Sequence, residues 1–188
     1  MIIKDANIRT ACCFSEPRTP SFPIGFDEKN AGSLRLKQVL MEPAVYLIEA
    51  LGVTHFISGV DLCVGQFVAE IVLDLKRDYP EVTLECVIPC EDQAANWTIA
   101  QRDRYFSIVE RCDKETLLQR QYSKDCIRKK KEYMVKQSNY VLVVWNGKPG
   151  SAGKLLSIAR TLGKIVILID SNTYEVRTYL INTSDTAQ

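Results

Sequence analysis

The sequence predicts an α/β fold: a three-layer, doubly wound, mostly parallel sheet of the Rossmann-like type with helices on both faces. Three observations support this prediction. Short apolar runs alternate with amphipathic stretches along the chain. The inner runs, residues 140–145 and 165–169, are continuously apolar, which is typical of strands covered on both faces. Positions 64, 67, 68, 71, 72 and 75 form one apolar stripe at helical spacing.

The individual elements follow from the same two patterns. The first strand is expected at 10–14, and a loop then leads to a helix at 33–51, which Pro43 should kink or divide and Gly52 should end. The remaining expected elements are strands at 55–58, 83–88, 114–119, 140–145 and 165–169, and helices at 93–111, 125–137 and 151–162. A further helix carries the stripe from position 64 to 75, and Tyr79-Pro80 is expected to end it. We expect one domain over residues 1–170, with 171–188 forming a tail or an edge strand.

The bulk composition narrows the possible ligands and surroundings. Lys and Arg total 24 against 23 Asp and Glu, so a bound anion must be held locally and nucleic-acid binding is disfavoured. No apolar run approaches the roughly 20 residues of a membrane span, and no secretory leader pattern is visible. An odd number of cysteines, seven, several of them in apolar segments, favours reduced thiols and a cytoplasmic location.

Composition also limits the chemistry. His55 is the only histidine, which argues against a Ser–His or Cys–His nucleophile. The cysteines lack a paired C-x-x-C arrangement, so we expect no metal site. No cofactor is required, although a bound nucleotide is compatible with the pattern.

The turn after the second strand is the first candidate for ligand binding, because ligands of such sheets bind beyond the carboxyl ends of the strands. It runs Ser58-Gly59-Val60-Asp61-Leu62-Cys63-Val64-Gly65 into the strongest predicted helix. Gly59 allows close approach of a ligand, Ser58 supplies a hydroxyl, and the helix start attracts an anion. The alternative, of equal weight, is a simple tight turn in which Asp61 caps the helix.

The turn after the fifth strand is the second candidate. Three glycines and one serine, Gly147, Gly150, Gly153 and Ser151, fall within residues 146–153, again before a helix. Their backbone N–H groups would cradle an anion. The order of residues matches neither a P-loop nor the dinucleotide fingerprint.

With these two turns the chain resembles the SLOG superfamily, which includes the DNA-processing protein DprA and the LOG enzymes, and within it the YpsA-like family of small bacterial proteins. The resemblance spans about residues 9–170. It rests on Ala11-Cys12-Cys13-Phe14-Ser15 with Arg18, Ser58-Gly59 before Ala69-Glu70, Leu75-Lys76 with Tyr79-Pro80, Ile88-Pro89, Gln93, Trp97, Tyr105 and the turn from Gly147 to Gly153. It implies a pocket for nucleotides, including ADP-ribose-type molecules derived from NAD, and self-association as a homodimer.

Two departures from the family bear on activity. Ser15-Glu16-Pro17-Arg18-Thr19 stands where YpsA-like proteins often have Thr-Gly-His-Arg-Pro. Ser157 occupies the place of the glutamate with which LOG enzymes cleave a base from a nucleotide. The resemblance therefore favours binding and sensing of a nucleotide. The alternative is an N-glycoside hydrolase with Glu70 or Asp61 as the carboxylate, and single-stranded DNA binding is the least favoured.

The remaining candidates are weighed singly. Arg18 is expected to pair with a phosphate, whereas Glu70 is either a ribose contact, a base or an exposed carboxylate. Trp97 is expected mainly in the core and Gln93 at the ligand, and Arg128-Lys129-Lys130-Lys131 is interpreted as a solvated helix face. The complete expected ligand set is Ser15, Arg18, Ser58, Gly59, Asp61, Gly65, Glu70, Pro89, Gln93, Trp97, Asn146, Gly147, Gly150, Ser151 and Gly153, with Tyr122 at the rim.

Overall fold

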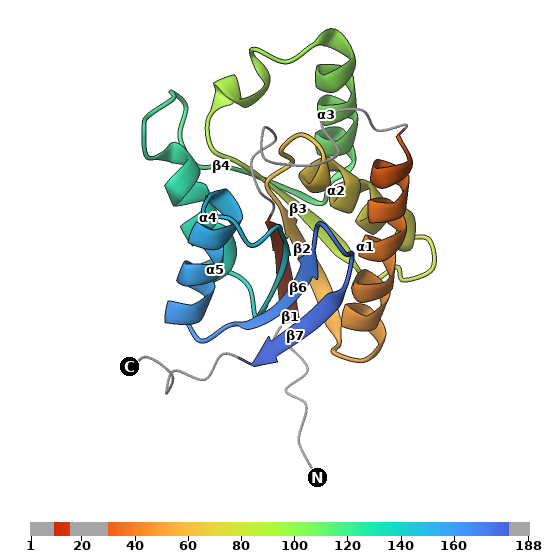
Figure 1. The fold of residues 1–188 in the computed structure, drawn as a ribbon. Coiled ribbons are helices and arrows are strands. Elements are labelled where there is room, and N and C mark those ends of the chain that lie inside the picture. The colour runs from red at the N-terminus through yellow and green to blue at the C-terminus, as the bar shows by residue number, and fades with distance from the viewer. Residues whose placement is uncertain (1–9, 16–29, 181–188) are drawn as a thin grey trace.

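A computed structural model describes residues 10–15 and 30–180 of the chain. These residues form a seven-stranded sheet in the order β4-β3-β2-β1-β5-β6-β7 (Figure 1). The first six strands are parallel, and β7 pairs antiparallel with β6. The strands are β1 (Thr10–Ser15), β2 (Val53–Ser58), β3 (Thr83–Ile88), β4 (Lys114–Leu117), β5 (Tyr140–Trp145), β6 (Ile165–Asp170) and β7 (Val176–Leu180).

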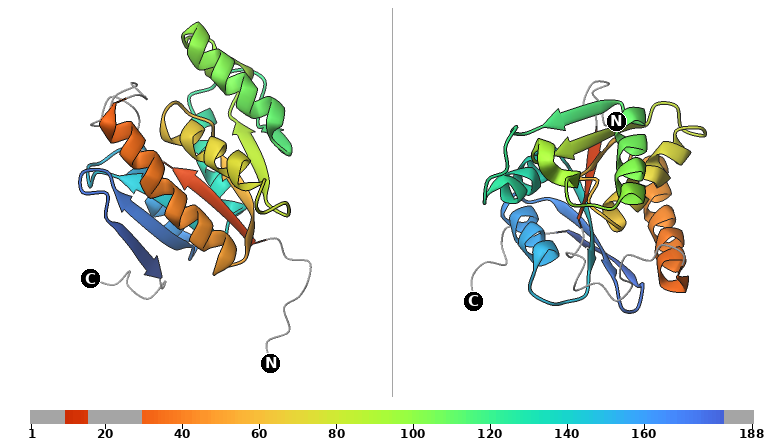
Figure 2. Two further views of the ribbon diagram at one scale, coloured as in Figure 1. Left: turned by 90° about the vertical axis from the view of Figure 1, so that its right-hand side faces the viewer. Right: turned by 90° about the horizontal axis from the view of Figure 1, so that it is seen from above.

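Helices cover both faces of this sheet. They are α1 (Ala31–Glu49), α2 (Val64–Leu75), α3 (Ile99–Arg111), α4 (Cys126–Lys136) and α5 (Ser151–Thr161). Helices α1, α2 and α3 lie on one face, and α4 and α5 lie on the other (Figures 1 and 2). The predicted three-layer, doubly wound architecture is therefore confirmed.

Successive side chains of the central strands pack alternately into two separate hydrophobic cores, one on each face of the sheet. Cys12 and Phe14 of β1 point to the α1–α2–α3 side, whereas Ala11 and Cys13 point to the α4–α5 side. This is the period of two that a strand imposes, and it explains why the inner strands are apolar at every position.

The strand order reverses between β1 and β5, which are neighbours in the sheet although a long stretch of chain separates them. Such a reversal opens a crevice at the carboxyl ends of the strands. The candidate turns after β2 and β5 both lie at this end. Residues 16–29, which follow β1, fall outside the described residues, and Arg18 with them.

One predicted helix is wrong at its start. The segment 93–111 is not continuous: a 3-10 turn, Glu91–Ala94, comes first, and α3 begins only at Ile99. Thr98 accepts from the backbone N–H of Gln101, and the Gln101 side chain accepts in return from Thr98 N–H. This capping box fixes the helix start, so Gln93 and Trp97 precede α3 and share no helix face.

Two smaller expectations concern Pro43 and the tail. Helix α1 runs through Pro43 without being divided, and Pro43 is buried. Residues 176–180 form β7, the edge strand that was one of the two alternatives for this segment. Among the described helices, none has the length and apolar character to cross a bilayer.

Candidate functional site

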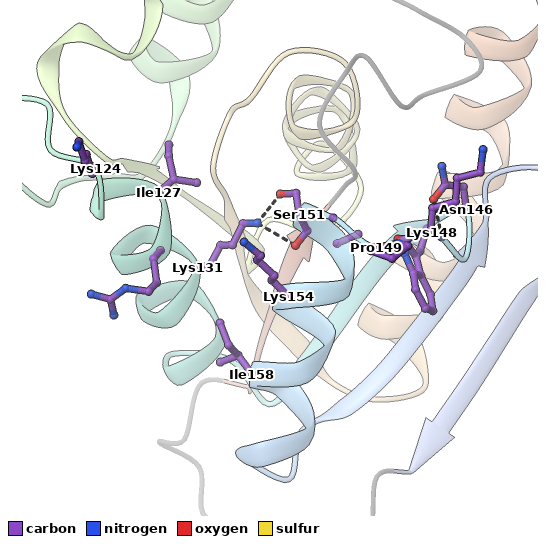
Figure 3. Close-up of a pocket in the computed structure, with 13 residues that line it drawn as sticks. Lys124, Ile127, Lys131, Asn146, Lys148, Pro149, Ser151, Lys154 and Ile158 are labelled. Carbon is purple, nitrogen blue, oxygen red and sulfur yellow. Dashed lines mark hydrogen bonds between the residues drawn. The ribbon is translucent and has the colours of Figure 1, made fainter.

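A cavity of about 440 Å³ lies beside the start of α5. We call it the lysine cavity (Figure 3). It is lined by Lys124, Ile127, Arg128, Lys131, Trp145, Asn146, Lys148, Pro149, Gly150, Ser151, Ala152, Lys154 and Ile158. Five of these side chains are basic and none is acidic. Arg128 is paired with Glu132 at 2.6 Å and with Asp125 at 3.4 Å, so the positive charge of the cavity comes mainly from its lysines.

The start of α5 adds backbone donors to this cavity. Gly150 is its N-cap and provides no side chain, so the N–H groups of the first turn are not capped by that residue. Lys131 of α4 reaches across and donates to both the carbonyl and the hydroxyl oxygen of Ser151, as Figure 3 shows. The helix N-terminus and the lysines therefore act on the same space.

The β5–α5 turn is held by its own hydrogen bonds. Trp145 Nε1 donates to the Lys148 carbonyl at 2.7 Å, and Lys148 N–H donates to Asn146 Oδ1 at 3.1 Å. Gly147 has φ +78°, a conformation that favours glycine. Gly153 lies in α5 against the Trp145 ring, where a Cβ would be in ordinary contact at 3.8 Å. These two glycines shape the turn, and neither lines the cavity.

A second cavity, of about 600 Å³, lies beyond the end of β3. We call it the carboxylate cavity. It is lined by Asp61, Pro89, Cys90, Asp92, Gln93, Ala95, Asn96, Trp97, Tyr122, Cys126 and Ile127. Two carboxylates, two amides and two aromatic rings contribute, and no lysine or arginine does. Ile127 lines both cavities, so they adjoin.

The Gly59 turn is tied to α4 and to the β3 exit. Lys130 Nζ lies 2.6 Å from Asp61 Oδ2 and 3.4 Å from the Gly59 carbonyl oxygen. Gln93 Nε2 donates to the same carbonyl at 2.9 Å. A Cβ on Gly59 would lie 2.9 Å from Lys130 Nζ and 3.0 Å from Asp61 Oδ2. A side chain at position 59 would therefore displace the Lys130–Asp61 pair.

The hydroxyl of Ser58 also forms hydrogen bonds within this turn. It donates to the Gly65 carbonyl at 2.8 Å and accepts from Val60 N–H at 3.1 Å, and Ser58 is fully buried. Val60 and Cys63 have φ of 51° and 70°, which few non-glycine residues adopt. Asp61 is not the helix cap, because Cys63 holds that position. Ser58 and Gly65 thus stabilise an unusual turn rather than point into either cavity.

Glu70 belongs to α2, lines neither cavity and faces α3. Arg104 donates to its two carboxylate oxygens, at 2.6 Å each, and Lys37 Nζ lies 3.8 Å from Oε2. Burial raises the pKa of Glu70, and the Lys37 charge opposes this shift. Burial also lowers the pKa of Arg104 to about 10. The geometry makes Glu70 a link between two helices.

Of the remaining expected contacts, Ser15 is buried at the end of β1, beside Val143 of β5. Trp97 lines the carboxylate cavity and at the same time packs edge-on against Tyr105, with ring centroids 5.5 Å apart. Tyr122 lines the same cavity and is 65% exposed, which places it at the rim.

Lys130 is the residue that the sequence interpretation missed. The expectation of a solvated face at 128–131 is wrong for Lys130, which is only 2% exposed. A signal was present: Cys126, Lys130 and Met134 follow each other at intervals of four and are all buried on one side of α4. A lysine in such a stripe needs a buried anionic partner, which Asp61 supplies.

The comparisons with known proteins agree with the fold. The model of the family described as the YspA SLOG family matches residues 18–165. A UPF0398 protein of Halalkalibacterium halodurans is 31% identical over 138 residues, 72% of each chain. UPF0398 proteins of Brevibacillus brevis and Bacillus cereus are 30% and 26% identical, over 70% and 77% of this chain and 71% and 80% of theirs. The chain therefore belongs to the YspA SLOG family, whose Rossmann-like fold indicates a nucleotide-related function.

Proposed function

We propose that this protein binds a phosphate-bearing nucleotide and acts as a sensing module for it. The observation that carries the proposal is the lysine cavity, where five basic side chains surround an uncapped helix start. Backbone N–H groups at a helix N-terminus and convergent cations are a standard arrangement for phosphate. Because the net charge of the chain is only +1, attraction of a phosphate depends on such a local group of cations.

The ligand class that we propose is a nucleotide or nucleotide sugar, such as ADP-ribose or another NAD derivative. The phosphate would lie at Gly150 and Ser151, with Lys148 and Lys154 beside it. The sugar and the ring would extend past Ile127 into the carboxylate cavity, which borders the lysine cavity there. Trp97 and Tyr122 supply aromatic surfaces on which a base can stack.

The surroundings of the candidate carboxylates favour binding over hydrolysis. Glu70 is clamped by Arg104 and lines neither cavity. Asp61 lines the carboxylate cavity, but one of its oxygens is held by Lys130. A general base must reach the proton that it removes, and Glu70 is poorly placed to do so.

The test is a thermal-shift titration with AMP, NAD and ADP-ribose, combined with chromatography for released base. At least one nucleotide should raise the melting temperature, because a ligand that binds only the folded state stabilises it by mass action. Lys148→Gln and Lys154→Gln should reduce that shift. Arg160→Gln is the matched control, since Arg160 is an exposed cation of α5 that does not line the cavity.

Two outcomes would overturn the proposal. The binding function fails if no nucleotide shifts the melting temperature, or if the Arg160 control weakens binding as much as the two lysine variants. Release of adenine or nicotinamide that disappears in Glu70→Gln would instead establish the hydrolase.

We extend the proposal to self-association and location. The family resemblance implies a homodimer, and Ile99 and Phe106 on α3 are 70% and 59% exposed, which suits a contact between copies. Light scattering on the purified protein tests this, and a monomer at all concentrations would contradict it. The free thiols, all seven of the chain, suit a reducing cytoplasm.

A further inference from the structure

We infer that the site selects nucleotides by the hydrogen-bond donors of their ring: an amino-bearing base lies in the carboxylate cavity while the phosphate lies in the lysine cavity. This inference rests on the proposed function and adds to it the orientation of the ligand and the class of base. It is carried by the opposite charge of two cavities that adjoin at one residue.

The contrast in charge is sharp. The lysine cavity has five basic side chains and no acidic one, whereas the carboxylate cavity has Asp61 and Asp92 and no basic one. A ligand that occupies both must be anionic at one end and neutral or cationic at the other. Lys130 pairs with Asp61 at 2.6 Å, so a second phosphate in the carboxylate cavity would face mainly the carboxylate of Asp92, and like charges at close range repel.

The position of the cavities in the fold sets the direction of the ligand. One lies beyond β5 and the other beyond β3, and β1 and β2 separate these strands in the sheet. Three strand spacings place β3 and β5 roughly 14 Å apart. Ile127 lies where the cavities meet. A ligand that bridges them is extended across the top of the sheet, with its phosphate toward β5.

The charged groups that line the carboxylate cavity, Asp61 and Asp92, are acceptors. Gln93 Nε2 donates to the Gly59 carbonyl at 2.9 Å and, at 3.5 Å, to Asp61 Oδ1. The amide donor of Gln93 is therefore engaged within the protein. Asp61 Oδ2 is taken by Lys130, whereas Asp92 is exposed and has no ion-pair partner among residues 10–15 and 30–180.

Asp92 is thus the acceptor best able to discriminate between bases. Adenine, cytosine and guanine carry an exocyclic amino group, and hypoxanthine and uracil do not. An amino group that donates to a carboxylate forms a charge-assisted hydrogen bond, whereas a ring carbonyl in the same place leaves the carboxylate facing an acceptor. We therefore expect AMP to bind roughly tenfold more tightly than IMP, and CMP more tightly than UMP, in proportion to one such bond.

The experiment is calorimetric titration of the full chain with AMP, IMP, CMP and UMP, repeated on Asp92→Asn. The amide keeps the size of the side chain but adds a donor and removes the charge, so the ratio of AMP to IMP affinity should fall toward one. Glu91→Gln is the matched control, because Glu91 is the adjacent exposed carboxylate and does not line the cavity. In Glu91→Gln the ratio of AMP to IMP affinity should stay at the wild-type value.

Inorganic pyrophosphate is the probe for the lysine cavity, where the phosphate of the ligand is proposed to lie. Its binding should weaken in Lys154→Gln and should not change in Asp92→Asn. Equal affinity for AMP and IMP in the wild type would overturn the inference and leave nucleotide binding intact, and so would a ratio that Asp92→Asn does not alter. If none of the nucleotides binds, the proposed function fails as well, so the two failures are distinguishable.

Discussion

Lys130 Nζ lies 2.6 Å from Asp61 Oδ2, and this contact joins α4 to the β2–α2 turn across 69 residues of sequence. The two side chains differ in burial: Lys130 is 2% exposed and Asp61 is 45% exposed. The pair therefore consists of a buried cation and a half-solvated anion. Because of this difference in burial, removing one partner should change the free energy of unfolding more than removing the other.

Removing the carboxylate should be more damaging than removing the amine. Asp61→Asn leaves a buried ammonium without its anion, and we expect a loss of about 3 kcal/mol in the free energy of unfolding. Lys130→Met leaves Asp61 free to hydrate and keeps an apolar side chain in the same space, so the loss should be below about 1 kcal/mol. Urea denaturation at pH 7 measures both. Equal losses, or a larger loss for Lys130→Met, would contradict this account.

The two glycine turns should respond differently to a methyl group. In Gly59→Ala the new Cβ meets Lys130 Nζ at 2.9 Å, and because this lysine is pinned, we expect a loss of roughly 1–3 kcal/mol. In Gly150→Ala nothing lies within 4 Å of the Cβ. Its stability should therefore remain at the wild-type value, while binding of pyrophosphate weakens because the methyl group stands where phosphate approaches.

Thermal melts and pyrophosphate titrations of the two variants separate these effects. A stable Gly59→Ala protein would show that the pair is not packed as described. Unchanged pyrophosphate affinity in Gly150→Ala would show that the phosphate does not bind at the start of α5.

Glu85 should make the stability of the protein depend on acid pH. This carboxylate is 2% exposed, and burial alone would raise its pKa; hydrogen bonds from His55, Thr116, Tyr133 and Lys114 outweigh burial and lower the pKa from 4.5 to about 2. A carboxylate whose pKa is lower in the folded than in the unfolded state stabilises the fold at pH values above its unfolded-state pKa. The contribution, about 3 kcal/mol, should be complete above pH ~5 and be lost as pH falls from there toward 2.

Urea denaturation at a series of pH values between 7 and 2.5 tests this expectation. Glu85→Gln should unfold more easily at pH 7 and should lose the acid-dependent component. Glu115→Gln, which alters an exposed carboxylate of β4, should keep the wild-type pH profile. A wild-type profile that is flat down to pH 3 would exclude the proposed role of the network.

Cys112 should be the most reactive thiol among the described residues. Its hydrogen bond with Cys86 is the largest of the influences that lower its pKa to about 7, and it is partly exposed while the other six cysteines are buried. With limiting iodoacetamide at pH 7.5, we expect Cys112 to be alkylated at least about tenfold faster than any other cysteine. Peptide mass spectrometry reads out each site. Labelling that begins at Cys12, Cys13 or Cys90, where the thiol pKa is raised, would refute the prediction.

Local periodicity was sufficient to determine most of the fold. The strands over Thr83–Ile88 and Tyr140–Trp145 have the bounds expected from their apolar patterns. The helix with the apolar stripe covers Val64–Leu75, so it ends before the expected stop at Tyr79-Pro80. A helix that buries one stripe and a strand that buries both faces each show a regular pattern of apolar residues in the sequence. The start of α3 was also encoded locally, by the Thr98–Gln101 capping box, but the amphipathic pattern upstream of it obscured that signal.

Only the tertiary structure decided what the charged and small side chains do. The sequence by itself placed Asp61 and Gly59 in a turn at the carboxyl end of the sheet; the fold brought Lys130 of α4 against both of them. It likewise distributed several of the expected ligand residues over two cavities, one lined by basic and the other by acidic side chains. The physical reason is that a buried charge is tolerated only where a distant segment supplies its partner, and such partners leave no periodic trace in the chain.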